Sequence, residues 1–126
     1  IIKTFDVPCI VQEYKENVIF GDKRVILVDG EPVGAVNRIP KKGEFKANLN
    51  LGGLAKKTFL TDKENEICNA IKETLVKKQL FFVGIDIIDE KLTEINVTSP
   101  TGISQINNLD KINIAEILWD TLLNKK

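Results

Sequence analysis

Residues 81–97 read FFVGIDIIDEKLTEINV, and this stretch predicts a β-hairpin with acidic side chains on one face. The apolar run at residues 81–88 is typical of a central strand that is buried on both faces. If residues 89–91 form a three-residue loop, Asp86 lies directly opposite Glu94 on the returning strand. A two-residue turn would instead shift the pairing by one residue and separate the two acids.

Three oxygen-bearing side chains share one face of this hairpin. In the same register Gly84 lies opposite Asn96, and residues two apart on a strand point to the same side, so Asp86, Glu94 and Asn96 lie together. Opposed Cβ atoms are about 4.5–5.5 Å apart, so the two carboxylates repel each other unless a cation lies between them. Carboxylate and carboxamide oxygens suit Mg²⁺, with Mn²⁺ as a substitute, and Gly84 would leave room for a nucleotide polyphosphate. The alternative is that both acids are solvated on an open sheet face, although a charge inside so apolar a run usually has a partner.

The composition is that of one soluble globular domain. The chain has 126 residues, of which 43% are apolar and 29% charged, so residues 1–126 are expected to form a single domain. Its 18 basic and 18 acidic residues give a net charge of zero, which argues against nucleic acid as the main partner. No apolar run approaches the roughly 20 residues that cross a bilayer, so no membrane partner is expected. Cys9 and Cys68 lie in apolar stretches, which favours a reduced, cytoplasmic protein.

The sequence lacks two residue types, histidine and methionine, and each absence bears on the expected function. The sequence has no histidine, which excludes a nucleophile activated by histidine and disfavours a zinc site. It also has no methionine and begins Ile1-Ile2. We therefore expect an excised part of a longer protein, whose other part holds some of the active site.

The rest of the chain predicts an α+β fold. Residues 23–39 have the pattern of two strands joined by an Asp-Gly turn. Thr61 and Glu64 have capping-box spacing at the start of a helix, and a last helix begins after Asp110 or Asn113. This order of elements favours a mainly antiparallel sheet with helices packed largely on one face.

Basic side chains occur at strand ends and in one long loop. Arg24 lies near the start of a strand and Arg38 near the end of its hairpin partner, and arginine can bind phosphate or carboxylate through two parallel hydrogen bonds. Residues 39–57 contain five lysines and three glycines against a single acid, as expected of a mobile lid over an anionic substrate. Ordinary strand-end charges and a merely solvated loop are the alternatives.

Five segments carry a resemblance to a known family: VQEY, DKRVILVDGEPV, NRIP, FVGIDII and LTEINVTSPTG. In this order and at these spacings they closely resemble the ATP-binding half of bacterial glutathione synthetases, which are ATP-grasp ligases, over nearly the whole chain. The resemblance implies the C-terminal ATP-grasp subdomain. It also implies ATP-dependent joining of γ-glutamylcysteine to glycine through an acyl phosphate, giving glutathione, ADP and phosphate.

The resemblance also implies roles for individual residues. Mg²⁺ would be held by Asp86, Glu94 and Asn96. The nucleotide would be contacted by Gln12, Glu13, Tyr14, Asp22 and Asn96. Arg24 and Arg38 would be catalytic, facing the transferred phosphoryl group and stabilising its charge. The peptide substrate would be contacted by Arg38, Lys46, Asn48, Ser99, Pro100 and Thr101.

This chain departs from the family pattern in two respects. Where the lid of the family usually carries Arg-Gly-Asn, residues 46–48 are Lys-Ala-Asn, which keeps the charge but not the guanidinium fork. The family's N-terminal substrate domain and its other ATP-grasp subdomain are missing, so we expect the chain to be nearly inactive alone and the full-length enzyme to be a homo-oligomer. The alternatives are another ATP-grasp carboxylate–amine ligase and a non-catalytic nucleotide- or metal-binding module.

Overall fold

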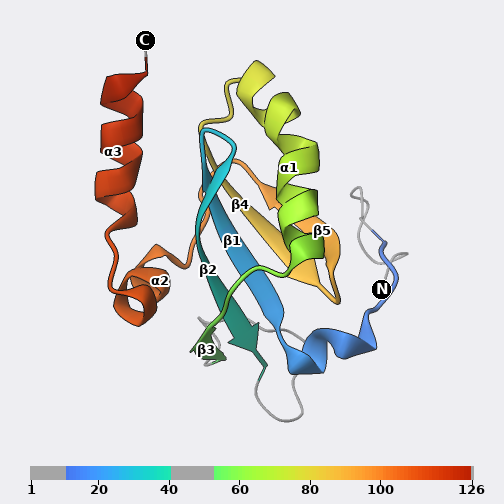
Figure 1. Ribbon diagram of the computed structural model, residues 1–126. Helices are drawn as coiled ribbons and strands as arrows, with labels where there is room; N and C mark the ends of the chain where they lie inside the picture. The colour runs from blue at the N-terminus through green and yellow to red at the C-terminus, as the bar shows by residue number, and fades with distance from the viewer. Residues whose placement is uncertain (1–10, 41–52, 126) are drawn as a thin grey trace, which may run out of the picture.

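A computed structural model describes residues 11–40 and 53–125 of the chain, and in this part five strands form one antiparallel sheet (Figure 1). The elements in chain order are the 3-10 helix η2 (Glu16–Phe20), β1 (Asp22–Val28), β2 (Glu31–Ile39), β3 (Leu54–Lys57), α1 (Asp62–Lys77), β4 (Phe82–Ile88), β5 (Lys91–Asn96), α2 (Ile103–Asp110) and α3 (Ile114–Asn124). The strand order is β3-β2-β1-β4-β5, and every neighbouring pair is antiparallel. The predicted α+β class is confirmed.

Helices cover both faces of this sheet, as Figure 1 shows for α1 on one side and for α2 and α3 on the other. Val25 of β1 packs in an apolar cluster with Cys68 of α1. Its neighbour Ile26 points the opposite way and packs with Ile106 of α2 and Ile114 of α3. The expectation of helices largely on one face is therefore wrong. Because β1 and β4 carry apolar side chains on both sides, a single helical layer would have left one side in water.

The predicted helix starts agree with the structure where a capping residue marks them. Thr61 and Glu64 form the expected capping box, in which each side chain accepts a hydrogen bond from the other residue's backbone N–H. The Asn113 side chain caps α3 by accepting a hydrogen bond from the backbone N–H of Glu116. Helix α2 was not predicted, and no side chain caps its start at Gly102. Among the described residues, none of the helices has both the length and the apolar character that a bilayer crossing needs.

The β4–β5 hairpin brings the two acids together by a route that differs from the prediction. The turn has only two central residues, Asp89 and Glu90, both with positive φ, so the expected three-residue loop is wrong. A β-bulge at Thr93 then adds one residue to β5, and beyond it Asp86 lies directly opposite Glu94. The Thr93 hydroxyl donates a hydrogen bond of 3.1 Å to the Asp86 carbonyl oxygen. The predicted opposition of the acids is confirmed, because the bulge restores the register that the short turn displaced.

Part of the predicted lid belongs to the sheet. Leu54–Lys57 form β3, which pairs with the end of β2. Residues 41–52, including Lys46 and Asn48, lie outside the described residues. A lid at residues 41–52 therefore stays a prediction.

Candidate functional site

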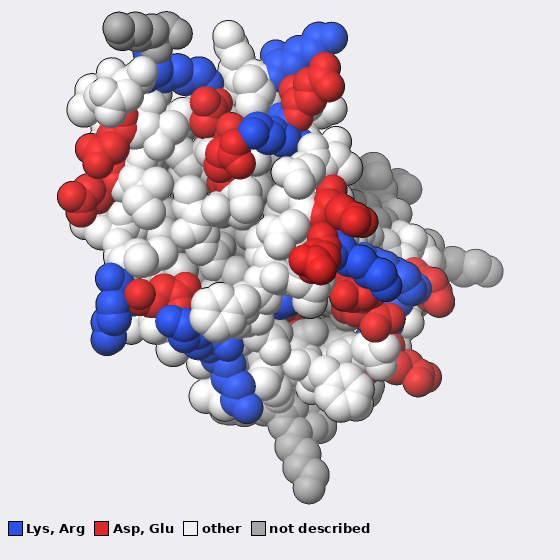
Figure 2. Space-filling model, in the orientation of Figure 1, with Lys and Arg blue, Asp and Glu red and all other residues white. Residues whose placement is uncertain are grey.

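Charged side chains on the surface are mixed in sign. Figure 2 shows acidic and basic side chains lying next to one another over the face that it draws. Several form exposed ion pairs, such as Lys63 with Glu90 at 2.9 Å. Exposed pairs of this kind contribute little to stability. Among the described residues, two groups of charged side chains are buried instead: Glu64, which pairs with Lys23, and a larger network around Arg24 and Asp86.

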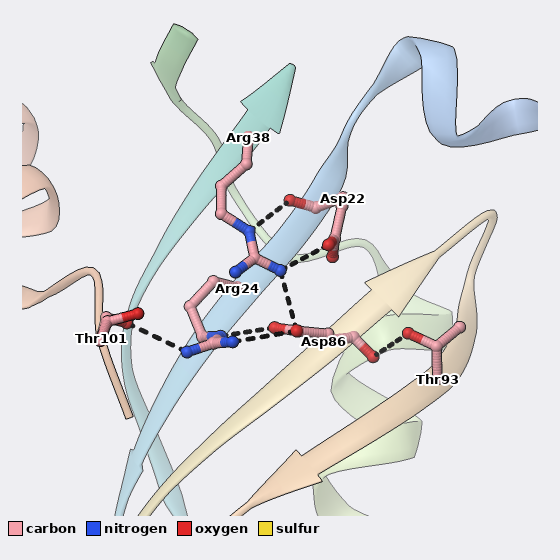
Figure 3. A network of polar contacts seen from close by, with 6 residues as sticks. All are labelled: Asp22, Arg24, Arg38, Asp86, Thr93 and Thr101. Atoms are coloured by element: carbon pink, nitrogen blue, oxygen red, sulfur yellow. Dashed lines mark hydrogen bonds and ion pairs between the residues drawn. The ribbon is translucent and has the colours of Figure 1, made fainter. Parts of the chain in front are cut away.

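Four charged residues form a network on one face of the sheet (Figure 3). Arg24 of β1 lies beside Asp86 of β4, and Asp22 of β1 lies beside Arg38 of β2. Because residues two apart on β1 share a face, all four side chains point to the side on which α2 packs. The fold thus brings the two predicted catalytic arginines onto the same face as the predicted metal-binding carboxylate.

The two arginines occupy both oxygens of the Asp86 carboxylate. Arg24 donates through Nε to Oδ1 and through Nη2 to Oδ2, the second at 2.9 Å. Nη2 of Arg38 lies 2.8 Å from the same Oδ2 and also bonds to Oδ2 of Asp22. Arg24 and Asp86 are only 4% and 5% exposed. Two guanidinium groups and two carboxylates therefore balance one another in a nearly dry setting.

Burial gives this network unusual protonation properties. Burial, together with the neighbouring charge of Asp86, raises the pKa of Asp22 to about 6 despite its ion pair with Arg38. One carboxylate oxygen of Asp22, Oδ1, is buried without a hydrogen bond among the described residues. Burial alone would lower the pKa of Arg24, but its hydrogen bond to Asp86 and the charges of nearby acids outweigh that effect and raise it. Arg24 therefore stays positively charged at neutral pH.

The three predicted metal ligands share a face, but two of them already have protein partners. Asp86 is held by the arginines, and Oδ1 of Asn96 accepts hydrogen bonds of 3.2 Å from the backbone N–H groups of Thr98 and Ser99. The Glu94 carboxylate is exposed. Among residues 11–40 and 53–125, no cluster of three or more acids or cysteines could by itself hold a metal ion. Two carboxylates and one carboxamide fit a hard cation in donor chemistry, provided that Asp86 exchanges its arginine partners.

The loop after β5 is attached to the same network. Nη1 of Arg24 donates a 3.2 Å hydrogen bond to the Thr101 carbonyl oxygen, and Pro100 is buried. A Cβ atom placed on Gly84 would lie 2.6 Å from Cβ of Pro100 and 3.3 Å from Cδ of Arg24. The expectation that Gly84 leaves room for a ligand is therefore wrong, because the protein's own loop fills that space. Ser99 stays exposed at the outer edge of the loop.

A separate cavity of about 540 Å³ lies where the N-terminal segment meets the hairpin. Its lining includes Gln12, Glu13 and Tyr14, three of the five residues predicted to contact the nucleotide, and Leu92 supplies an apolar wall. The other two, Asp22 and Asn96, do not line it. The Gln12 side chain donates a 3.3 Å hydrogen bond to the carbonyl oxygen of Thr93, at the bulge. This mixture of apolar wall and polar rim is typical of small-molecule sites.

Sequence reasoning missed the direct contact between the arginines and Asp86. Arg24 and Asp86 are 62 positions apart in the chain and meet only because β1 and β4 are neighbours in the sheet. The sequence indicated this contact only through Asp86 itself, because a charged residue inside an apolar strand usually has a buried partner.

Comparisons with known proteins agree on one family. The model of the prokaryotic glutathione synthetase ATP-grasp domain matches residues 1–111. A glutathione synthetase of Mesorhizobium japonicum is 47% identical over 122 residues, which are 97% of this chain and 39% of that protein. One from Prochlorococcus marinus MIT 9313 is 51% identical over 116 residues, 92% of this chain and 38% of that protein. One from Synechococcus elongatus is 50% identical over 109 residues, 86% of this chain and 34% of that protein. The chain thus spans less than two fifths of the length of these curated relatives.

Proposed function

Because the chain belongs to the prokaryotic glutathione synthetase ATP-grasp domain family, we propose that it is the ATP-binding part of an enzyme that joins γ-glutamylcysteine to glycine. The observation that carries this proposal is the placement of Arg24 and Arg38 on the sheet face that also holds Asp86, Glu94 and Asn96. Two fixed positive charges beside a set of hard oxygen ligands suit the transfer of a phosphoryl group, in which the protein chiefly positions groups and stabilises charge.

In the proposed reaction, a carboxylate oxygen of γ-glutamylcysteine attacks the γ-phosphorus of ATP, and the bond from phosphorus to ADP breaks. The glycine amine then attacks the carbonyl carbon of the acyl phosphate, loses a proton and displaces inorganic phosphate. Arg24 and Arg38 would stabilise the negative charge on the transferred phosphoryl oxygens and on the leaving phosphate. Asp86, Glu94 and Asn96 would hold Mg²⁺, or Mn²⁺ in its place, and the bound cation would add positive charge at the phosphates.

The nucleotide base and the peptide substrate would contact different segments of the chain. The cavity lined by Gln12, Glu13 and Tyr14 would take the adenine and ribose. The loop with Ser99, Pro100 and Thr101 would contact γ-glutamylcysteine, since Arg24 holds the loop next to the charged network. The peptide contacts of Lys46 and Asn48, the cytoplasmic location and the homo-oligomer stay predictions from the sequence.

An ADP-release assay tests the proposal. In a protein of the relatives' length that carries this chain, ADP release should require both γ-glutamylcysteine and glycine. Arg38→Lys should lower the rate on the order of 100-fold, because lysine keeps the charge but loses the fork that binds two oxygens. The 126-residue chain alone should release little ADP. Release that proceeds equally without glycine, or only with another amine, would contradict the assignment and favour a different ATP-grasp ligase.

A further inference from the structure

We propose that Arg38 and Arg24 act as internal cations that neutralise the Asp86 carboxylate, so that a divalent cation and a phosphate anion each bind more tightly when the other is present. The inference rests on the proposed function, since it concerns the same metal-binding oxygens. The proposed function does not include this property. Before any ligand binds, the charge of Asp86 is neutralised by the protein's own arginines, and a bound cation replaces one of these arginine contacts.

The Asp86 carboxylate is surrounded by guanidinium groups. Both oxygens of Asp86 accept hydrogen bonds or ion pairs from guanidinium nitrogens (Figure 3). The residue is only 5% exposed, so the oxygens cannot easily gain a further ligand without losing one. Oδ2 accepts from both arginines, whereas Oδ1 accepts only from Nε of Arg24. A cation that binds Asp86 through Oδ2 must therefore displace at least one arginine contact.

The positive and negative charges of the buried network are equal in number. Asp22 and Asp86 carry two negative charges, and Arg24 and Arg38 carry two positive ones, so the buried group of four is neutral in its ionised form. A divalent cation added alone would leave a guanidinium group without its carboxylate in a poorly solvated place, which is unfavourable. A phosphate anion that arrives with the cation supplies the released guanidinium with a new partner of the geometry it binds best. Each of the two ligands thus removes the obstacle to the other, which is positive coupling between them.

The two arginines differ in how firmly they are held. Arg24 makes two hydrogen bonds to Asp86 and a third to the Thr101 carbonyl oxygen. Arg38 reaches Asp86 only through Nη2, and it is also held by the side chain and the backbone carbonyl of Asp22. Arg38 can therefore leave Asp86 while Asp22 keeps it beside the site. We assign the exchange to Arg38, with Asp22 as its positioning residue.

Binding of Mn²⁺ without nucleotide tests the exchange, because its readout is the electron paramagnetic resonance signal of free Mn²⁺ and not activity. In Arg38→Gln, one competitor for Asp86 is gone, so Mn²⁺ alone should bind about tenfold more tightly than to wild type. Lys72→Gln is the matched control, because Lys72 pairs with Glu31 on the surface and its loss removes the same charge. Adding Glu94→Gln to Arg38→Gln should abolish the gain.

The outcomes separate this inference from the proposed function. If Arg38→Gln binds Mn²⁺ no more tightly than wild type or Lys72→Gln, the exchange is refuted. If Glu94→Gln also fails to weaken Mn²⁺ binding in the presence of ADP, the proposed metal site is refuted with it. If Arg38→Gln does not fold by circular dichroism, the double variant Arg38→Gln with Asp22→Asn removes both charges of that pair. It should show the same tenfold gain, and its absence would refute the exchange.

Discussion

Replacing Asp22 by asparagine is expected to stabilise the protein at neutral pH, although it removes one half of an ion pair. Burial and the charge of Asp86 raise the pKa of Asp22 from 3.8 to about 6, and the favourable contacts with Arg38 are already included in that value. The folded state therefore binds a proton at Asp22 more tightly than the unfolded state does. Stability from this group is fully present below pH 4 and is lost as the pH rises through about 6.

The expected change in the free energy of unfolding follows from the pKa shift of Asp22. At 1.36 kcal/mol per pKa unit, the rise in the pKa of Asp22 corresponds to about 3 kcal/mol lost on ionisation. Asparagine has the shape of the protonated acid and cannot ionise. Asp22→Asn should therefore raise the free energy of unfolding by up to about 3 kcal/mol at pH 7.5 and by about 1 kcal/mol at pH 4.5.

Urea denaturation of wild type and variant at both pH values measures this difference. Asp120→Asn serves as the control, because Asp120 is exposed on α3 and its replacement should change stability little at either pH. The reasoning is refuted if Asp22→Asn is less stable than wild type at pH 7.5, or if its advantage is the same at both pH values. A stabilised variant that binds nucleotide less well would indicate that Asp22 serves function at the expense of stability.

Three further outcomes are expected. Gly84→Ala should lower the free energy of unfolding by about 1–3 kcal/mol in urea denaturation, because its Cβ would clash with Pro100. An unchanged urea midpoint would mean that the loop moves away without cost. Asn113→Ala should lose about 1 kcal/mol because α3 loses its cap, whereas no loss would show that water replaces the cap. Burial raises the pKa of the Cys68 thiol, so in a Cys9→Ser background iodoacetamide should label it far more slowly at pH 8 in the folded protein than in urea. Equal labelling rates would contradict that burial.

Features encoded by neighbouring residues could be predicted from the sequence. The capping box at Thr61 and the cap at Asn113 depend on residues three positions apart, so their side chains meet whenever the helix forms. The shared face of Glu94 and Asn96 follows from the strand period of two. These predictions needed no knowledge of which strands are neighbours.

Features that depend on distant parts of the chain could not be predicted in this way. That Asp86 is paired with Arg24 follows from the antiparallel neighbours β1 and β4, which the order of elements does not reveal. The space beside Gly84 looked open from the hairpin alone, and only the folded loop shows that Pro100 fills it. The error in loop length had no effect on the opposed acids, because the bulge at Thr93 compensated for it.

That compensation has a consequence for aligning related sequences. The hairpin has two separate places, the turn at Asp89-Glu90 and the bulge at Thr93, where one residue can be gained or lost. A two-residue turn with the bulge and a three-residue turn without it place the same number of residues between Asp86 and Glu94, so both arrangements keep the two acids opposed. Aligners that count positions from the turn would therefore misplace the acid in a relative with a three-residue loop and no bulge. Deleting Thr93 should leave Glu94-dependent Mn²⁺ binding in place, because a two-residue turn without a bulge also sets Glu94 opposite Asp86. Loss of that binding would contradict this register.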